Sequence, residues 1–591
     1  MRGLCCAWIV GWIAVTAPVV AQARVLLQGF YWDVPSPAAG NPGEVWWWDR
    51  LAAQAQALRR SGFTAVWLPP VTKGASGGYS VGYDPFDDYD IGSRNQRGTV
   101  PTRYGTREQL MRCVAMLRAA GLDVYLDLVQ NHRNGDPGDF QFRYKDAYGV
   151  EGRGRFPKYP YDFHPHVPQD PEVPLGDQEY QFGRDIAHVN GANGRIGREL
   201  KAAGDWLTRT LDVQGYRLDY VKGISARWLR EFLNHGAMRG RFAIGEYYDG
   251  NLELVAGWVR DSMRNRVAAF DFPLRGLLHQ MCAQNGQFDM RLLDGAGLVG
   301  RDPERAVTFV ENHDTDRDSP VIKGKMLAYA YILTATGYPS VFYRDYSMEP
   351  GCYRLKPRLD RLLQVHEHLA SGGQRTLWKD PDVFIFERTG GQRLLVGLSD
   401  DPSRSRTVTV PTGFGPRVRL RDYTGHMPDL QTDARGYLRV TLPVNRDGDG
   451  YVCYAPVMPW PRAVPVRPRW VTQEFHGAPD LDVPPIVADR WTVVGRIWPR
   501  PGHTITARLS CDAGVWHDRT HVVLELIGPG GHLASLVLRG RQQASRVLRA
   551  RALRTGWHVW RARAHNLPSG STALSCRLRV HYLAASTLIT K

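Results

Sequence analysis

After its first residues the chain alternates short apolar runs with longer stretches in which apolar residues recur at helical spacing. The run VLLQGFYW (25–32) is followed by WWWDRLAAQAQALRRSG, which ends at Gly62, and then by FTAVWLPP (63–70). Short apolar runs are typical of buried parallel strands, and strands that alternate with helices form βαβ units. We therefore predict an α/β fold with a (β/α)8 TIM barrel over residues 24–372.

Other parts of the chain depart from this alternation. Residues 133–187, rich in Gly, Pro, Asp and Tyr, are too long for an ordinary loop, and they predict a lobe inserted after the third barrel strand. Short alternating runs over 373–456 predict an antiparallel β-sandwich. A Pro-rich stretch (457–470) predicts a stiff linker, and 471–591 predict a further C-terminal β-rich accessory domain.

Residues 1–23 have the pattern of a secretory signal peptide, with Arg2, an apolar stretch and small residues at Ala21 and Ala23. An uncleaved anchor is the alternative, because the stretch is of borderline length for a membrane span. We expect a secreted protein, extracellular or periplasmic, with no membrane span in the mature chain. Export permits disulfides, and Cys511 with Cys576 is the pairing that we favour.

The positive charge of the chain is concentrated near its C-terminus. The formal net charge is +16, and the residues after 456 contribute +12, from 19 basic and 7 acidic residues. The arginines are scattered rather than gathered in one tract, so we do not predict a nucleic-acid partner. A solvated basic face is one interpretation, and binding to an acidic surface such as an envelope or polysaccharide is the other.

Three acidic residues follow apolar runs of the predicted barrel: Asp219 in GYRLDYVKG, Glu246 in FAIGEYYDG and Asp314 in TFVENHDTD. The C-terminal ends of barrel strands converge on one mouth, so these acids are expected to meet. Cleavage of a glycosidic bond with retention needs a carboxylate and a carboxylic acid about 5–5.5 Å apart. The sequence therefore predicts a glycosidase site at the mouth, with these three residues as its catalytic acids.

The neighbours of two acids predict different roles for them. Arg217, two residues before Asp219 on the same strand face, is expected to keep that carboxylate ionised. A structural ion pair is the alternative. Glu246 follows the apolar run Phe242–Gly245, and burial would raise its pKa so that it can donate a proton. A capping or solvated glutamate is the alternative there.

Taken with LDLVQNH (126–132), these segments stand in an order that resembles the α-amylase family of glycoside hydrolases (glycoside hydrolase family 13). The resemblance extends through FTAVWLPPVTKG and GYDPFDDYDIG and covers roughly residues 25–455. It is strongest to the bacterial liquefying and plant-like α-amylases. One departure is Lys222-Gly223, where many bacterial relatives have Lys-His, so a side-chain contact to the leaving sugar is lost.

The resemblance implies that Asp219 is the nucleophile, Glu246 the general acid and base, and Asp314 the acid that grips the sugar hydroxyls. It implies substrate contacts for a stacking tyrosine, two histidines and two cations: Tyr83, His132, Arg217, Lys222 and His313. The family also binds Ca²⁺ between barrel and lobe. The implied ligands are Asn131, Asp177, Asp185 and the backbone carbonyl of Gly223.

The implied activity is endo-hydrolysis of α-1,4-glucosidic bonds in starch- or glycogen-type glucans by a monomeric enzyme. One alternative is an α-glucan transferase of the same fold, and another is a non-catalytic glucan-binding or surface protein, which the presence of all three acids disfavours. The C-terminal domain resembles nothing that we can assign. Its tryptophans would form either a starch-stacking platform or the core of the domain: Trp491, Trp498, Trp516, Trp557 and Trp560.

Overall fold

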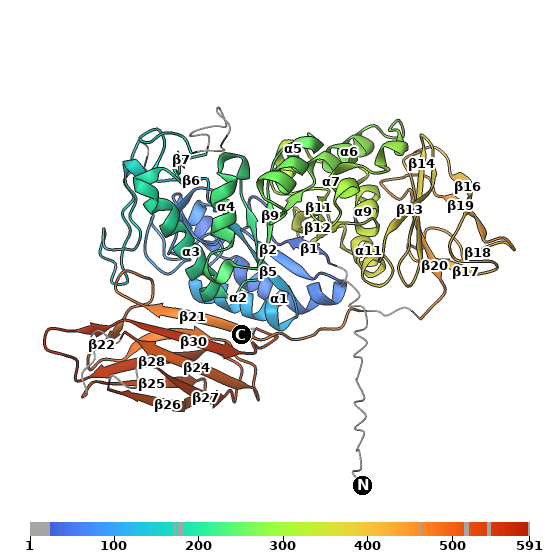
Figure 1. The fold of residues 1–591 in the computed structure, drawn as a ribbon. Coiled ribbons are helices and arrows are strands. Elements are labelled where there is room, and N and C mark those ends of the chain that lie inside the picture. The colour runs from blue at the N-terminus through green and yellow to red at the C-terminus, as the bar shows by residue number, and fades with distance from the viewer. Residues whose placement is uncertain are drawn as a thin grey trace, which may run out of the picture.

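The computed structural model describes residues 24–588, except for 137, 171–172, 174–181, 460–462, 513–518 and 541–544. The predicted signal peptide, Asp177 and Trp516 lie outside the described residues. Figure 1 shows a central barrel with a lobe beside its mouth, one β-domain at its flank and a second β-domain beneath it. In the described part of the chain, no helix is both long and apolar enough to cross a membrane.

Eight parallel strands close into the barrel in the order β1-β12-β11-β10-β9-β8-β5-β2. Their residues are almost all buried, which is why the sequence shows short continuous apolar runs rather than alternation. The predicted (β/α)8 fold is confirmed. The strands are β1 (Leu26–Gln28), β2 (Ala65–Leu68), β5 (Asp123–Leu128), β8 (Gly215–Leu218), β9 (Phe242–Gly245), β10 (Ala268–Phe270), β11 (Ala306–Phe309) and β12 (Tyr338–Phe342).

Helices follow the strands and cover the barrel (Figure 1). The second helix begins with a capping box, in which Thr106 and Gln109 each bond the other's backbone N–H. The first helix ends as expected at Gly62, whose φ of +124° suits only glycine. The helices are α1 (Trp47–Ser61), α2 (Arg107–Ala119), α3 (Arg195–Leu211), α4 (Ala226–Leu233), α5 (Leu252–Gly257), α6 (Phe272–Ala283), α7 (Gly297–Arg301), α8 (Thr315–Asp318), α9 (Lys325–Thr334), α10 (Tyr343–Tyr346) and α11 (Lys356–His368).

Two small hairpins stand at the mouth. One pairs β3 (Lys73–Gly74) with β4 (Pro85–Asp87), and the other pairs β6 (His132–Arg133) with β7 (Arg184–Asp185) in the inserted lobe. The lobe is fixed to the first hairpin by buried charges. Lys158 Nζ lies 2.7 Å from an oxygen of Asp88, and Arg133 binds the same carboxylate. Burial of such a pair demands well-matched partners, so this contact fixes one geometry of the lobe.

The flanking β-domain consists of a six-stranded sheet, β13-β14-β15-β20-β17-β18, and a two-stranded sheet, β16-β19. Inward-facing aliphatic residues from both sheets form its separate core. The strands are β13 (Gln374–Lys379), β14 (Val383–Arg388), β15 (Leu394–Ser399), β16 (Arg406–Pro411), β17 (Arg419–Asp422), β18 (Leu430–Gln431), β19 (Tyr437–Leu442) and β20 (Tyr451–Pro456).

The C-terminal domain is a second sandwich, with sheets β21-β30-β24-β27 and β23-β28-β25-β26 and a small β22-β29 pair. Cys511 and Cys576 lie opposite each other on β24 and β30, but both are free thiols, so the favoured disulfide is absent. The strands are β21 (Val471–Gly477), β22 (Ile486–Val487), β23 (Thr492–Ile497), β24 (Thr504–Cys511), β25 (His521–Gly528), β26 (Gly531–Arg539), β27 (Ser545–Arg551), β28 (His558–His565), β29 (Ala573–Leu574) and β30 (Cys576–Tyr582).

Aromatic residues of this domain dock it on the barrel. Trp498 and Trp557 meet edge to face, with centroids 5.2 Å apart, and the Arg112 guanidinium of α2 lies against both rings, 4.8 and 4.7 Å from their centroids. Trp560 is fully buried in the sandwich core. Asp480 forms a two-bond ion pair with Arg155 of the lobe. The domain core and the docking contact therefore use three of the tryptophans that the sequence also allowed as a starch platform.

Candidate functional site

The predicted acids meet at the mouth of the barrel. Asp219 directly follows β8, Glu246 directly follows β9, and Asp314 stands in the loop after β11. Strands β8 and β9 are paired neighbours, so the first two acids emerge side by side. Asp219 and Asp314 are both close enough to Glu246 to disfavour its ionised form. The topology of the barrel therefore brings together residues that are far apart in the sequence.

A single guanidinium links the carboxylates. Arg217 Nη1 donates to Asp219 Oδ1 at 2.6 Å, and Nη2 contacts Glu246 Oε1. Nη1 also donates to Asp127 at 2.9 Å. Arg217 is fully buried, and its position two residues before Asp219 places both side chains on one strand face. The structure thus finds Arg217 as a bridge among three acids, where the sequence predicted a partner for Asp219 alone.

Asp127 is a site residue that sequence reasoning missed. It lies one residue before the C-terminal end of β5, and its Oδ2 accepts hydrogen bonds from Tyr83 Oη at 2.7 Å and Trp67 Nε1 at 3.0 Å. Burial raises the pKa of Asp127, while Arg217 opposes the rise. An acid inside the apolar run Leu126–Leu128 was the available signal, because a buried carboxylate needs charged or donor partners.

Glu246 has the environment of a carboxylic acid that holds its proton near neutral pH. Burial raises the pKa of Glu246 to about 8; Asp219 and Asp314 add to the rise, and Arg217 opposes it. The backbone N–H of Tyr220 donates to Glu246 Oε2 at 3.2 Å and fixes the carboxyl group. The direction of the shift is the one that the apolar approach predicted.

Stacked rings line the site beside the acids. Tyr83 lies parallel to the His313 ring, with centroids 4.9 Å apart, and Trp32 is parallel to Tyr83 at 5.7 Å. The guanidinium of Arg317 covers the Trp32 ring at 4.3 Å. Flat aromatic side chains of this kind present apolar faces to a sugar ring. The sequence predicted Tyr83 and His313 here but missed Trp32, whose only signal was its place after the first strand.

Both predicted histidines are buried, and their pKa values are lowered by burial. His132 Nε2 bonds the backbone carbonyl of Tyr83 at 3.0 Å, and its Nδ1 has no partner among the described residues. His313 Nδ1 bonds Gln28 at 3.0 Å, and its Nε2 lies 3.4 Å from Asp314. Neutral imidazoles of this kind can donate or accept one hydrogen bond per nitrogen.

Lys222 stands apart from this buried group. Its ammonium is partly exposed and lies 3.2 Å from Asp249. It also lies 5.5 Å from the centroid of the Tyr247 ring. These contacts of Lys222 are with Asp249 and Tyr247, not with the other predicted substrate-binding residues.

The predicted calcium ligands are brought together in part. The Oδ1 atom of Asn131 is buried without a partner among the described residues. A Cβ atom on Gly223 would lie 2.1 Å from it, so only glycine fits here. Asp185 is buried on β7, opposite His132 of β6. An orphaned amide oxygen with carbonyl and carboxylate groups nearby is the chemistry that Ca²⁺ prefers, so these residues fit the ion. No group of three acidic, histidine or cysteine ligands occurs among the described residues.

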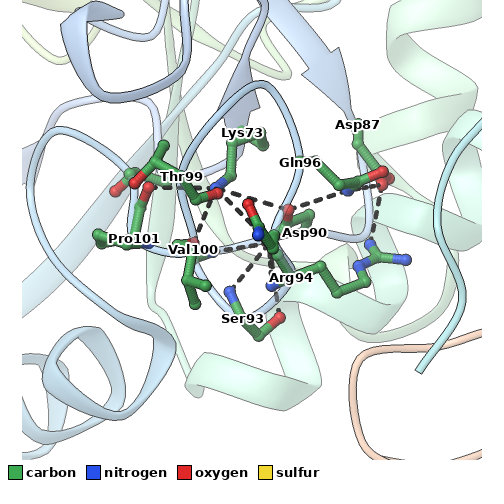
Figure 2. A network of polar contacts seen from close by, with 12 residues as sticks. Lys73, Asp87, Asp90, Ser93, Arg94, Gln96, Thr99, Val100 and Pro101 are labelled. Atoms are coloured by element: carbon green, nitrogen blue, oxygen red, sulfur yellow. Dashed lines mark hydrogen bonds and ion pairs between the residues drawn. The ribbon is translucent and has the colours of Figure 1, made fainter. Parts of the chain in front are cut away.

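Figure 2 shows how the hairpin that carries Tyr83 is held. The Lys73 ammonium is fully buried and donates to the carbonyl oxygens of Thr99, Val100 and Pro101 at 2.8, 2.7 and 3.1 Å. Asp90 lies 3.8 Å away. A charged donor surrounded by backbone acceptors ties the segment 94–101 to β3, and Tyr83 lies in the loop between β3 and β4.

Comparison with known proteins decides the family. Residues 48–348, just over half of the chain, match the model of the alpha-amylase catalytic domain. The chain belongs to the α-amylase family. A Bacillus sp. (strain 707) protein described as a glucan 1,4-alpha-maltohexaosidase is 30% identical, over 72% of this chain and 89% of its own. The cytoplasmic alpha-amylase of Escherichia coli (strain K12) is 29% identical, over 70% of this chain and 95% of its own.

Solved structures of this α-amylase fold extend the match. The gamma-CGTase of alkalophilic Bacillus clarkii covers 93% of this chain and 83% of its own, with 16% identity and a TM-score of 0.57. At that identity the likeness concerns the fold alone. Because the chain belongs to the α-amylase family, it is a glycoside hydrolase, as the three acids predicted. The names of its sequence relatives support action on glucans. Glucanotransferases occur among the solved structures that share the fold.

Proposed function

We propose that the enzyme hydrolyses internal α-1,4-glucosidic bonds of starch- or glycogen-type glucans with retention of anomeric configuration. The observation that carries the proposal is the contact of one guanidinium, that of Arg217, with both Asp219 and Glu246. A retaining mechanism needs its two carboxyl groups close together, whereas an inverting mechanism needs room for water between them. Two carboxyl groups on one guanidinium favour the first arrangement.

In this mechanism Glu246 gives its proton to the glycosidic oxygen while Asp219 attacks the anomeric carbon. The leaving chain departs with the proton, and Asp219 holds the sugar as a covalent ester. Glu246, now ionised, takes a proton from water as the water oxygen attacks the same carbon and releases Asp219. Arg217 supports both steps, because its charge stabilises the carboxylate form of each acid in turn.

The other residues orient the sugar. Tyr83 and Trp32 offer parallel faces on which a glucose ring stacks, and Asp314 accepts hydrogen bonds from its hydroxyls. His313 donates to a hydroxyl from Nε2, because its Nδ1 accepts from Gln28. His132 donates from Nε2 to the Tyr83 carbonyl, so its Nδ1 accepts from a hydroxyl. Lys222 contacts the sugar on the leaving side. Asp127 positions Arg217 and Tyr83 without touching substrate.

We propose further that Asn131, Asp185 and Gly223 hold a Ca²⁺ ion that rigidifies the wall between barrel and lobe. The unpartnered buried Asn131 oxygen supports this assignment. When bound, the ion would order the residues around His132, the residue after Asn131 in the chain. The N-terminal pattern supports export of the enzyme from the cytoplasm.

Reducing-sugar release from soluble starch tests the proposal. Asp219→Asn and Glu246→Gln are each expected to lose activity by a factor of about 10³ or more, because each removes a group that acts in the transition state. Asp318→Asn, at the exposed end of helix α8 just after Asp314, is the matched control and should keep wild-type activity. Equal activity of wild type and Asp219→Asn would defeat the site assignment.

Product analysis separates the remaining alternatives. Polarimetry or NMR of the first products should give the α-anomer, since two displacements restore the configuration. In dilute maltooligosaccharide the hydrolase yields shorter chains alone. Disproportionated longer chains would make the enzyme a transferase, and first products of the β-anomer would refute retention.

A further inference from the structure

The outward face of the sheet β21-β30-β24-β27 carries a dense array of arginines, which we call the basic sheet face. Alternate residues of these strands, such as Leu509 and Leu578, point into the core of the sandwich. The residues between them point outward. Five outward arginines come from three adjacent strands: Arg508 of β24, Arg549 and Arg551 of β27, and Arg577 and Arg579 of β30.

The strand register places these charges close together. Arg508 is directly opposite Arg579, and Arg549 is opposite Thr506 on the same side of β24. Like charges directly opposite each other destabilise a sheet, because their Cβ atoms are only about 4.5–5.5 Å apart. Arg577 and Arg579 nevertheless keep 58% and 57% of their side chains exposed. The arrangement is a lateral array of solvent-facing guanidinium groups.

The domain neutralises this array only in part, because a single carboxylate lies near two of the five arginines, 3.7 Å from Arg579 and 4.0 Å from Arg577. Among the described outward residues of the four strands, the sole carboxylate is Glu474 of β21. It is buried and already engaged by His476 at 3.0 Å, with Arg579 at 3.7 Å. Arg508 and Arg549 have no carboxylate partner in the described part of the chain. A ligand that supplied negative charge would relieve the repulsion that the fold leaves in place.

Apolar side chains stand among the arginines. Val547 of β27 is directly opposite Arg508 and is exposed. Trp470, also exposed, stacks on His581 of β30 at 5.1 Å, and Leu553 beyond β27 is 69% exposed. A neutral glycan stacks on aromatic platforms, and a single nucleic-acid strand favours a groove. An acidic glycan would also bind arginines, but it would leave the exposed apolar side chains without a partner. A flat, two-dimensional array of arginines mixed with Trp, Val and Leu matches the interface of a lipid bilayer.

We propose that the basic sheet face binds the surface of a membrane that contains anionic lipids. The guanidinium groups contact headgroup phosphates in bidentate fashion, and Trp470, Val547 and Leu553 enter the boundary between headgroups and acyl chains. The linker before this domain bonds Arg60 and Arg118, at the ends of α1 and α2 that point away from the mouth. A membrane-bound enzyme would therefore leave its mouth accessible to a polymeric glucan.

Co-sedimentation with vesicles tests this proposal. The full chain is mixed with vesicles of phosphatidylcholine, with or without phosphatidylglycerol, and the ratio of the two binding constants is measured. This ratio removes any contribution that an apolar N-terminus makes equally to both vesicles. The wild type should prefer the anionic vesicles, and high salt should abolish the preference because it screens exposed charges.

The variant Arg508→Gln/Arg579→Gln should lower the binding constant for anionic vesicles about thirtyfold. Each arginine at a membrane surface contributes a factor of about five, and the variant removes two. The matched control is Arg435→Gln/Arg439→Gln, two exposed arginines of the other β-domain, and it should bind as wild type. Both variants should keep activity on soluble starch, which shows that they fold. Equal loss in both variants, no preference in the wild type, or binding to dextran sulfate without binding to vesicles would each overturn the proposal.

Discussion

Replacing Lys73 with methionine tests how the Tyr83 hairpin is held. Methionine keeps the length of the side chain but removes the hydrogen bonds to the carbonyls of Thr99, Val100 and Pro101 and a longer one, of 3.4 Å, to the carbonyl of Arg94. The carbonyls of Val100 and Pro101 would each lose a donor, which costs about 1–3 kcal/mol, whereas those of Thr99 and Arg94 keep the N–H of Gln96. Methionine also avoids the free-energy cost of burying the Lys73 charge, which offsets part of this loss. We therefore expect the free energy of unfolding to fall by about 3–5 kcal/mol, the range for breaking a buried ion pair.

The loss of stability should be largest in residues 94–101, and it should weaken substrate binding because Tyr83 is then held less firmly. Amide hydrogen exchange of residues 94–101 should accelerate, and KM for maltooligosaccharides should rise more than kcat falls. Arg388→Met is the matched control, because Arg388 is also buried and bound to carbonyls, those of Thr334 and Ala335, near the start of β12 rather than at the mouth. It should lose stability with KM unchanged. A Lys73→Met enzyme with wild-type exchange and wild-type KM would refute the reasoning.

Three further predictions concern the mouth and the lobe. Activity should fall as pH rises through about 8, because Glu246 loses its proton there, and a kcat/KM profile measures this limb; a limb that survived in Glu246→Gln would belong to another group. Asp127→Asn should lower kcat about 10²-fold in steady-state assays by releasing Arg217 and Tyr83, and unchanged kcat would remove its positioning role. A calcium chelator should lower the melting temperature of wild type but not of Asn131→Ala, as followed by calorimetry, whereas equal shifts in both would argue against the Asn131 site.

Periodicity accounts for what the sequence could predict. Apolar runs and helical spacing specify the barrel strands, and residues two apart on a strand share a face, which paired Arg217 with Asp219. Asp127 and Trp32 escaped prediction because their partners, Arg217 and Tyr83, lie far away in the chain and no period links them. Strand register determines which residues meet across a barrel, and register cannot be predicted from the periodicity of a single sequence.

The same limit applies to residues whose partners are backbone atoms or another domain. Lys73 is one lysine among many until the loop 94–101 turns its carbonyls inward. The tryptophans of the C-terminal domain carry no mark that separates a core residue from a docking residue or a sugar platform. Their role became visible only when Arg112 of α2 was found in contact with two of them.

The contact of Arg112 with these two tryptophans has a consequence for how the molecule unfolds. The C-terminal domain contacts α2 through Trp498 and Trp557 and contacts the lobe through Asp480, so it bridges two parts of the catalytic region. A module on a free tether melts by itself, whereas a bridging one shares its transition with its neighbours. Heating should therefore produce a merged calorimetric peak for barrel, lobe and C-terminal domain, and removal of the last domain should lower the melting temperature of the barrel that remains.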